Sequence, residues 1–336
     1  MLFRLEPLRF SFIAREPIHF PPGQSANILR GAFGVIFRRI ACLPHCQSAY
    51  SCPQRLTCPY ARLFEPSATS GPSGLADHPR PFVFRALHLD AQTFAPGQPF
   101  HFDLNLFDTD PTTIAYLILT FAQLARDGLG PQRGKVELTT VSKRNHLGDP
   151  ALTIYENGLI QNRDDLPPLT LDLTHSAAEP ISHLRIKFLT PTELKSGQQL
   201  AARPDFAIVA TRARDRISTL RELYTADGPL PIDFRAFGDR ANLVKMTRCD
   251  IHDIDIQRRS SRTGQTHSIG GFIGEAEYEG DLTEFVPYLD AAKWTGIGRQ
   301  TVWGKGEIEV APSGFSHIPN GVEDEYRGQS DHNHRR

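Results

Sequence analysis

The sequence predicts an α+β protein in which one plan of strands and helices is used twice. Three observations lead to this prediction. Several short segments alternate apolar and polar residues, and others repeat apolar residues at helical spacing. In each half of the chain these segments follow one another in the order β-α-β-β-α-β. Both halves also end with a helix, a G-x-G turn, a G-K pair and a short strand.

Size and composition fit two globular domains. A chain of 336 residues exceeds what one hydrophobic core usually serves. The formal net charge of −1 excludes a uniformly basic nucleic-acid-binding protein. The first residues show no signal peptide, and no apolar run approaches the roughly 18 residues of a membrane span. We therefore expect a cytoplasmic protein whose five cysteines do not form structural disulfides.

The first half contains the plan in order. Leu2–Ala14 alternates apolar residues as a half-buried strand does, and the Pro-Pro-Gly run at 21–23 ends it. Ser25 or Asn27 then caps a helix that continues to Ile40, with apolar residues at i, i+4, i+7 and i+8. Further elements are expected as strands at 82–89 and 100–106, a helix at 112–126, a strand at 136–141, a hairpin around Asn157-Gly158 and a Pro-rich link at 165–180.

The second half repeats the plan. The expected elements are a strand at 183–189 that Pro191 ends, a helix at 205–224, strands at 243–256 and 269–278, a short helix at 282–292 and a strand at 307–310. Two β-α-β-β-α-β units in series are tandem ferredoxin-like, RRM-like domains. We expect the N-terminal domain at 1–175 with a cysteine-rich insertion at 42–66, the C-terminal domain at 181–310, and a disordered polar tail at 311–336.

The two glycine-rich segments are expected to be one loop used twice. GLGPQRGKVEL begins at Gly128, and GIGRQTVWGKGEIEV begins at Gly296. Glycine allows positive φ and close approach of a ligand, and successive N–H groups in such a turn attract anions. Alternatively, the glycines serve only the geometry of a tight turn between a helix and a strand, without binding a ligand. A dinucleotide site is excluded because its glycine motif follows a strand and opens a helix, the reverse of the order here.

Four cysteines form a candidate metal site. Cys42, Cys46, Cys52 and Cys58 lie within seventeen residues, spaced C-x3-C-x5-C-x5-C. Four thiolates can satisfy a tetrahedral zinc ion and hold together a loop that lacks its own core. A closed site of this kind leaves no open position, so the metal would be structural. An iron–sulfur cluster and four reduced, metal-free cysteines are the alternatives. Cys249 lies in an expected strand as a small buried residue.

Several motifs along the chain resemble one family. They are Leu29-Arg30-Gly31-Ala32-Phe33-Gly34, Cys58-Pro59-Tyr60-Ala61-Arg62-Leu63-Phe64-Glu65, Leu189-Thr190-Pro191-Thr192, Arg258-Arg259-Ser260-Ser261-Arg262 with Gln265, and Gly270-Gly271-Phe272-Ile273-Gly274-Glu275 with Tyr278, followed by the second glycine loop. In this order they resemble the CRISPR-associated precursor-RNA processing endoribonucleases of the repeat-associated mysterious protein (RAMP) superfamily. The resemblance covers most of the chain apart from loops and tail.

The resemblance implies a function. Family members hold a CRISPR repeat RNA between tandem ferredoxin-like domains and cut it without a catalytic metal. The RNA 2′-hydroxyl attacks the adjacent phosphate and leaves a 2′,3′-cyclic phosphate and a 5′-hydroxyl. CRISPR repeat RNA, as precursor guide RNA, is therefore the expected partner, with other CRISPR effector subunits as further partners and neither DNA nor membrane. A non-cutting guide-RNA-binding subunit of the same superfamily is the alternative.

The resemblance places a catalytic histidine on or just after the first helix, facing the C-terminal glycine loop. His45 is the nearest candidate in this chain, although its place beside Cys46 also suits a metal ligand. His19 precedes the helix, and His267 lies between two expected strands of the second domain. An active site without histidine is the remaining alternative. Histidine suits the work of acid and base because its pKa lies near neutrality.

Basic residues, together with the glycines of the second loop, are expected to contact the RNA backbone. The candidates are Arg30, Arg38 and Arg39 on the first helix, Arg258 and Arg262 in the Arg-rich segment, and Gly296, Gly298, Arg299, Gly304, Lys305 and Gly306 in the second glycine loop. The arginines of the helix at 205–224 (Arg212, Arg214, Arg216 and Arg221) are expected to form a solvated face with Asp215 and Glu222. Trp294 and Trp303 flank the loop, where each suits base stacking or a core position.

Overall fold

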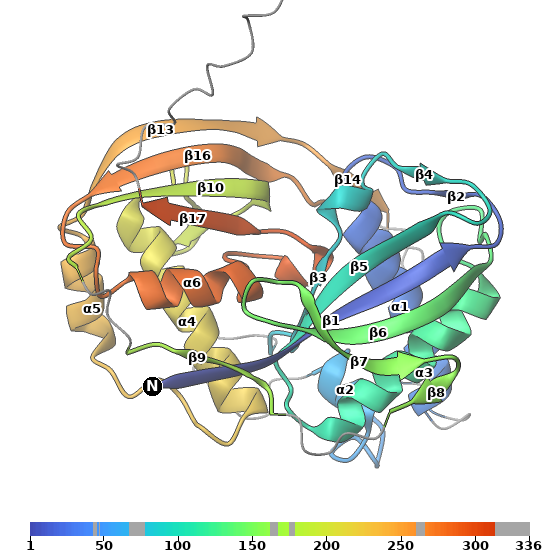
Figure 1. Cartoon of the computed structure of the whole chain (residues 1–336). Coiled ribbons are helices and arrows are strands. Elements are labelled where there is room, and N and C mark those ends of the chain that lie inside the picture. Colours follow the sequence, from blue (N-terminus) through green and yellow to red (C-terminus); the bar gives the residue numbers. More distant parts are fainter. Residues whose placement is uncertain are drawn as a thin grey trace, which may run out of the picture.

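The structure is a computed structural model, and it describes residues 1–42, 46, 48–66, 78–161, 167–174, 179–259 and 266–312. Two sheets lie side by side, and each is covered on one face by helices (Figure 1). No helix in these ranges is both long and apolar enough to cross a bilayer. The tail expected at 311–336 falls outside the described residues, apart from its first two.

The first sheet is built around one long strand. β1 (Leu2–Ala14) lies between β5 (Pro99–Leu106) and β6 (Val136–Arg144), and every pairing is antiparallel. The sheet continues with β3 (Phe82–Arg85) beyond β5, and with β7 (Pro150–Glu156) and β8 (Leu159–Ile160) beyond β6. The helices α1 (Ser25–Ala41) and α3 (Pro111–Asp127) pack on the face that carries the apolar residues of β1, namely Leu8, Phe10 and Phe12.

The second sheet has the same strand order. It contains β13 (Lys245–Ile254), β16 (Gly271–Glu279), β10 (His183–Thr192) and β17 (Ile308–Pro312), in this spatial order. Its helices are α4 (Phe206–Tyr224), α5 (Phe234–Ala241) and α6 (Val286–Thr295). In both halves the first and third strands of the plan lie in the middle, with the fourth strand beside the first. The expected tandem ferredoxin-like fold is therefore confirmed.

Short elements complete the chain. They are β2 (Ile18–His19) with β4 (Thr93–Phe94), α2 (Pro59–Leu63), the 3-10 turn η1 (Leu87–Leu89), β9 (Leu169–Asp172), the hairpin β11 (Lys195–Ser196) with β12 (Gln199–Leu200), the hairpin β14 (Gln257–Arg259) with β15 (Thr266–Ser268), and the 3-10 turn η2 (Thr301–Trp303).

Three local expectations were wrong. The Pro-rich link contains a strand, β9, which pairs antiparallel with the first residues of β1. Pro191 does not end the strand before it, because β10 continues past a bulge to Thr192. The helix α1 is not capped by Ser25 or Asn27, since Ser25 is its first residue and its N-cap position is Gln24, which makes no side-chain cap. Helix α5 was not expected at all.

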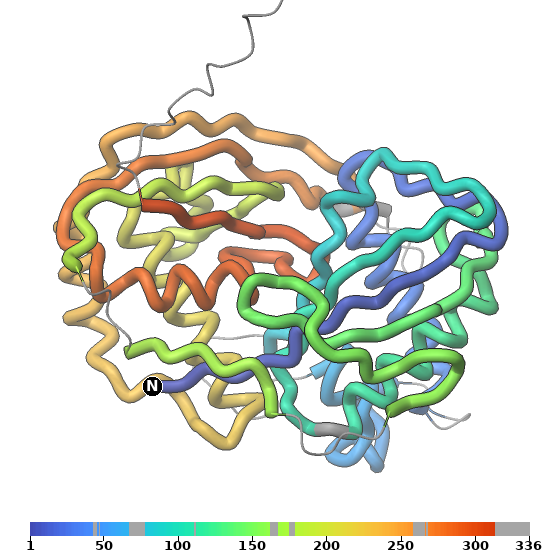
Figure 2. The backbone as a smooth tube through the Cα atoms, viewed as in Figure 1, coloured from blue at the N-terminus to red at the C-terminus, as the bar shows by residue number. Residues whose placement is uncertain are grey.

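The two halves interlock. Phe3 and Leu5, at the start of β1, pack into the core of the second half together with Leu173. In the other direction, Val302 and Trp303 of the second half pack against the core of the first half. The backbone trace shows β1 beginning beside the second half and crossing into the first sheet (Figure 2). Each core is therefore completed by residues from the other half of the sequence.

Candidate nucleic-acid interface

The two glycine-rich segments close in the same way. The Leu129 amide donates to the Gly134 carbonyl at 2.8 Å, and the Ile297 amide donates to the Gly306 carbonyl at 2.9 Å. A Cβ at Gly128 would lie 2.0 Å from the Arg133 carbonyl oxygen, and one at Gly306 would lie 1.9 Å from that of Ile297. Both positions also have positive φ, which glycine adopts without strain. The structure therefore agrees with one loop used twice; we call residues 128–135 the first loop and residues 296–306 the second loop.

The loops differ in what they contact. The first loop stays within its own half, where a Cβ at Gly134 would lie 2.5 Å from the Pro17 carbonyl oxygen. The second loop reaches into the other half. A Cβ at Gly304 would lie 2.5 Å from the Cβ of Ala26, at the start of α1, and 3.3 Å from the carbonyl oxygen of Phe84 on β3. Gly304 is thus needed for this close approach as well as for its φ of 78°.

A third element meets the second loop and α1 at the same place. Gln24, before α1, donates through Nε2 to the carbonyl of Gln257 on β14 at 3.3 Å. Gln300 of the second loop donates to the carbonyl of Ser268 on β15 at 3.4 Å, and the Lys305 ammonium donates to the Gly270 carbonyl. We call this meeting point the junction: residues 24–26, Gln257, residues 268–270 and residues 300–305.

A carboxylate that follows the turn η1 holds the start of α1. Asp90 Oδ1 accepts the Ser25 amide at 3.0 Å and shares the single Ser25 hydroxyl proton with the Ala86 carbonyl, whose oxygen lies 2.7 Å from Ser25 Oγ. A carboxylate at a helix N-terminus satisfies a free amide and opposes the positive end of the helix dipole. Asp90 therefore caps the N-terminus of α1, the role that the sequence had suggested for Ser25 or Asn27. Ser25, Asp90, Trp303 and Lys305 line a small cavity of about 40 Å³ at the junction.

Lys305 is buried in the junction with 3% of its surface exposed. Burial lowers the pKa of its ammonium to about 8, from an ordinary value of 10.5; nearby Glu193 raises it, and Arg299 lowers it further. The Gly270 carbonyl is a neutral acceptor, so it satisfies a donor without supplying a counter-charge. Lys305 therefore holds the second loop to residues 268–270 and carries a charge that the fold disfavours.

The lowered pKa of Lys305 predicts a pH dependence of stability. Between pH 8 and 10.5 the unfolded chain, with its ordinary pKa, binds more protons than the folded chain, so the contribution of Lys305 to stability rises with pH. We expect the free energy of unfolding of the wild type, relative to Lys305→Met, to increase from pH 7.5 to pH 10. Urea unfolding of both proteins at several pH values measures this difference. A difference that stays constant over that range would show an unshifted ammonium.

Arg30 and Trp303 join α1 to the second loop. The Arg30 guanidinium lies over the Trp303 ring at 5.4 Å and over the Phe64 ring at 4.5 Å, and 9% of the residue is exposed. Cation–π contacts of this kind stabilise a desolvated guanidinium. Arg30 is therefore placed to hold the loop against α1. Trp294 packs with the second core instead, with Arg144 over its ring at 5.4 Å.

The other basic candidates lie in different settings. Arg38 donates to the Cys46 carbonyl at 3.1 Å, and Arg39 pairs with Asp127 at the surface. Arg299, half exposed, pairs with Glu193. The backbone of Arg258 lies on β14, next to the junction, whereas Arg262 lies outside the described residues. The structure thus brings the second loop against β15, the partner strand of β14, while Arg38 and Arg39 belong to the far end of α1.

The candidate histidines are separated. His19 is exposed on β2, where its Nδ1 lies 2.9 Å from the Thr93 hydroxyl, and its carbonyl oxygen faces Gly130 of the first loop. His267 is on β15, and the carbonyl of the next residue, Ser268, accepts from Gln300 of the second loop. His45 lies outside the described residues. Of the two histidines that are placed, His267 directly precedes a residue that contacts the second loop, whereas His19 faces the first loop.

The cysteines of the insertion contact one another in pairs. Cys42 lies close enough to Cys46 and Cys58, and Cys46 to Cys52, for their thiols to influence one another's pKa. Burial, followed by the charges of Cys58 and Cys46, raises the pKa of the Cys42 thiol to about 12. Across the described residues, however, no three Cys, His, Asp or Glu side chains are grouped as a metal-binding set. The four thiols are therefore close together without surrounding one point.

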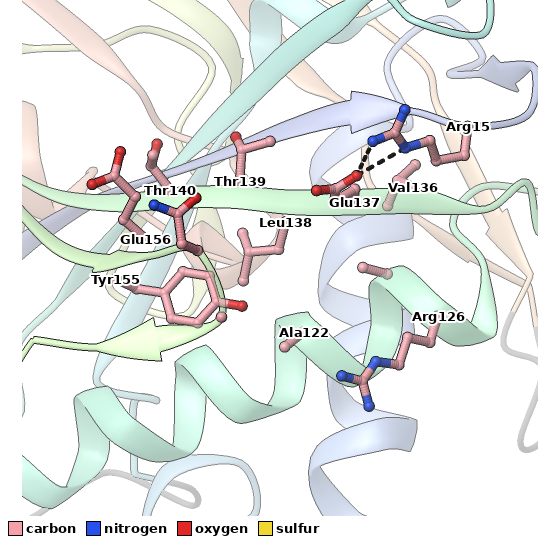
Figure 3. A pocket seen from close by; sticks show the side chains of 13 residues that line it. Arg15, Ala122, Arg126, Val136, Glu137, Leu138, Thr139, Thr140, Tyr155 and Glu156 are labelled. Atoms are coloured by element: carbon pink, nitrogen blue, oxygen red, sulfur yellow. Dashed lines mark hydrogen bonds and ion pairs between the residues drawn. The ribbon is translucent and has the colours of Figure 1, made fainter.

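A separate groove lies within the first half, away from the second loop. It occupies about 480 Å³ between α3 and the strands β6 and β7 (Figure 3). Arg15 pairs there with Glu137, and the remaining charges are Arg126 and Glu156. Equal numbers of cations and carboxylates line this groove, and no residue of the second half is among them. We therefore take the junction as the candidate site.

The junction also contains residues that the sequence had not indicated, namely Gln24, Gln257 and Gln300, and Asp90 borders it through Ser25. Gln300 has a positive φ of 60°, which is uncommon for a residue with a side chain. Its position inside the second glycine loop was the one available signal.

Comparisons with known proteins agree with this description. Residues 186–308 match the family model described as CRISPR-associated endoribonuclease Cas6, and residues 3–165 match a model described as an N-terminal domain. No curated protein is matched by the sequence.

Solved structures share the fold over nearly the whole chain. A Cas6 (TTHB231) product complex has a TM-score of 0.52 and 16% identity, covering 92% of this chain and 99% of that one. Thermus thermophilus Cas6 (TTHB231) has a TM-score of 0.50 and 14% identity, covering 92% and 98%. A Cas6-RT-Cas1–Cas2 complex has a TM-score of 0.52 and 10% identity, covering 92% of this chain and 29% of that one. At these identities the likeness concerns the fold.

Proposed function

The chain belongs, through its C-terminal domain, to the Cas6-type family of CRISPR-associated endoribonucleases, and from this premise we propose that it cuts CRISPR repeat RNA in precursor transcripts. One observation carries the proposal to a site: the second loop of one half lies against the start of α1 of the other half, with Gly304 facing Ala26. An RNA strand bound at the junction would touch both halves.

The proposed reaction is a transesterification within the RNA. The 2′-oxygen attacks the adjacent phosphorus, the bond from phosphorus to the 5′-oxygen breaks, and the products carry a 2′,3′-cyclic phosphate and a 5′-hydroxyl. A base takes the proton of the 2′-hydroxyl and an acid protonates the leaving oxygen. Backbone N–H groups of the second loop and the guanidinium of Arg299 would stabilise the charge on the phosphate. No metal takes part in this proposal.

We propose a histidine as the base, with His45, His19 and His267 as candidates. His267 is supported by the backbone contact of its neighbour Ser268 with the second loop. His19 is supported by its exposure and by its place shortly before α1. Alanine variants of each, assayed with the same RNA, would identify the base by a loss of cleavage without a loss of binding.

The expected partner is repeat RNA, with other CRISPR subunits as further partners. One structure of similar fold is a Cas6 product complex, and another is a Cas6-RT-Cas1–Cas2 complex. These describe the related proteins, and they support looking for the same classes of partner here.

The test is cleavage of an end-labelled repeat RNA from the host's own array, in excess EDTA. One cut that yields a cyclic phosphate, and no cut in a matched RNA with a single 2′-deoxy at that position, is the expected result. Cleavage only after added Mg²⁺ would contradict the metal-free reaction. Tight, salt-sensitive binding without any cut would replace the enzyme by the non-cutting guide-RNA-binding subunit.

We also propose a structural zinc ion at Cys42, Cys46, Cys52 and Cys58. Pairwise contacts already bring the four thiols together, and a tetrahedral ion would draw them around one point. The metal would hold the loop that follows α1, and no chemical step passes through it.

Purified protein is accordingly expected to contain about one zinc ion per chain. Cys52→Ser should lower the zinc content and the melting temperature, because three thiolates bind zinc less tightly than four. Cys249→Ser, at a cysteine outside the cluster, is the matched control and should keep the zinc. Metal analysis by mass spectrometry gives the content. Iron with visible absorbance would indicate a cluster instead, and a metal-free protein with unchanged stability would remove the site.

A further inference from the structure

A second cavity adjoins the second loop and is strongly basic. It has a volume of about 520 Å³ and lies between helix α4, residues 79–80 and the turn η2. Its charged lining consists of Arg80, Lys195, Arg212, Arg216 and Arg299, with Asp215 as the single carboxylate. We call it the α4 pocket. Trp303 lines both this pocket and the small cavity at the junction, so the two are neighbours along the loop.

The carboxylate of the pocket is already engaged. Asp215 lies 2.6 Å from Arg214, which is buried, and 3.6 Å from Arg212. Arg299 pairs with Glu193, which is outside the lining. Within the described residues, Lys195 and Arg216 have no ion-pair partner. The pocket therefore contains more positive charge than the protein itself neutralises.

In the described part of the chain, Arg216 is held by a neutral group and not by a carboxylate. Its Nε donates to the Thr295 carbonyl at 2.9 Å, a neutral acceptor. Burial, and then the like charge of Arg85, lowers the pKa of Arg216 to about 9. Arg85 is itself buried, donates to the Lys293 carbonyl at 3.0 Å and lies 3.8 Å from Glu307. A desolvated guanidinium without a carboxylate is unfavourable unless another anion completes its surroundings.

The setting of Arg216 also corrects an expectation about helix α4. Arg214 and Arg221 are buried, with 6% and 5% exposed, so these arginines do not form a solvated face. Arg221 donates to the Asp227 carbonyl at 3.2 Å, and Arg214 to the Phe234 carbonyl at 2.6 Å. Arg212 and Arg216 line the pocket instead. The helix thus points two of its arginines at the cavity beside the second loop.

We propose that the α4 pocket binds a non-scissile phosphate of the RNA, and this rests on the proposed function. One guanidinium group can donate two parallel hydrogen bonds to the oxygens of a phosphate, and it remains charged at all physiological pH values. The shared Trp303 wall places the pocket directly beside the junction, so a strand that crosses the second loop would bring a neighbouring phosphate to Arg216 and Lys195. This contact would fix the register of the RNA without reading its bases.

The test compares how tightly the wild type and the variants bind a repeat RNA that carries a 2′-deoxy nucleotide at the cut and therefore stays intact. Lys195→Gln with Arg216→Gln is expected to weaken binding about tenfold and to reduce the slope of log Kd against log salt concentration by about one for each phosphate that is no longer neutralised. Arg248→Gln on β13 is the matched control, because Arg248 is surrounded by Asp250, Glu275 and Glu277. Lys195→Gln alone breaks no ion pair among the described residues. If the double variant unfolds, the same binding measurement is made with this single variant.

Three results would overturn the proposal. One is unchanged affinity, and another is weaker binding with an unchanged salt slope. The third is a rise in melting temperature with inorganic phosphate that the variants lose, while the variants still bind RNA as tightly as the wild type. That result would assign the pocket to a free anion. Because the RNA is uncleavable, the outcome is independent of catalysis. A wild type that binds RNA but cuts none would contradict the nuclease and leave this test valid.

Discussion

Gly304→Val is expected to reduce RNA cleavage about a hundredfold while most of the fold remains. The Cβ alone would lie 2.5 Å from the Cβ of Ala26, so the second loop and α1 would have to move apart. The backbone φ of 78° adds a strain of about 1–2 kcal/mol for a residue with a side chain. A displacement of about 1 Å between reacting groups can cost on the order of a hundredfold in rate. Single-turnover cleavage of the repeat RNA measures the loss.

The control for Gly304→Val is Gly158→Val. Gly158 has a φ of 81° and nothing within 4 Å of an added Cβ, so it carries the same backbone strain without the clash. Its cleavage should match the wild type at a similarly lowered melting temperature. Ala26→Gly combined with Gly304→Ala should recover activity lost by Gly304→Ala alone, because the clashing Cβ is then absent. Full activity of Gly304→Val would contradict a site at the contact of loop and α1.

Local patterns were sufficient to predict most of the elements. The alternation in Leu2–Ala14 gave a strand with the bounds that the structure has, and the helix expected at 112–126 is α3, Pro111–Asp127. Both depend on periodicity within one segment, which the burial of one face enforces. Helix α5 was missed although Asp233, its cap, and the apolar Phe234, Phe237 and Ala241 carried a signal. The helix has only eight residues, so its apolar periodicity was too short to predict it.

Contacts between distant segments were the part that the sequence did not reveal. Asp90 caps α1 from 65 residues away, so no local motif could indicate it. Likewise β9 was hidden in a Pro-rich link because its pairing partner is the first strand of the chain. The arginines of α4 were assigned to solvent because i, i+3 pairing with Asp215 is visible in sequence, whereas the cavity beside the second loop is not. Periodicity shows that a face is buried but does not identify what buries it.

The site was predicted in part. The second glycine loop was singled out by its repetition, and the structure places it against α1 as a loop between two halves. Its tryptophan could not be assigned beforehand, since Trp303 packs against the core of the opposite half. The roles of the three histidines remain predictions. A histidine acts through its distance to a reacting atom, and spacing along the chain does not determine that distance.

Phe33→Ala is expected to lower the free energy of unfolding by about 3–5 kcal/mol, since it removes a fully buried aromatic side chain. Phe33 lies at the centre of an aromatic cluster, with ring centroids 5.0 Å from Phe37, 5.4 Å from Phe121 and 5.5 Å from Phe82. Close packing on these sides hinders collapse around the cavity, and aromatic pairs contribute beyond their buried area. Urea unfolding followed by circular dichroism measures the change.

The matched control lies two residues away on the same helix. Val35 is 67% exposed, so Val35→Ala should change stability by no more than about 0.5 kcal/mol. The comparison also bears on the site, because Phe33 packs against Phe84, whose carbonyl oxygen faces Gly304 of the second loop. Phe33→Ala should therefore lose cleavage at temperatures where circular dichroism still reports a folded chain, while Val35→Ala keeps it. If Phe33→Ala were to cut RNA normally up to its melting temperature, the aromatic core would stabilise α1 without positioning it at the junction.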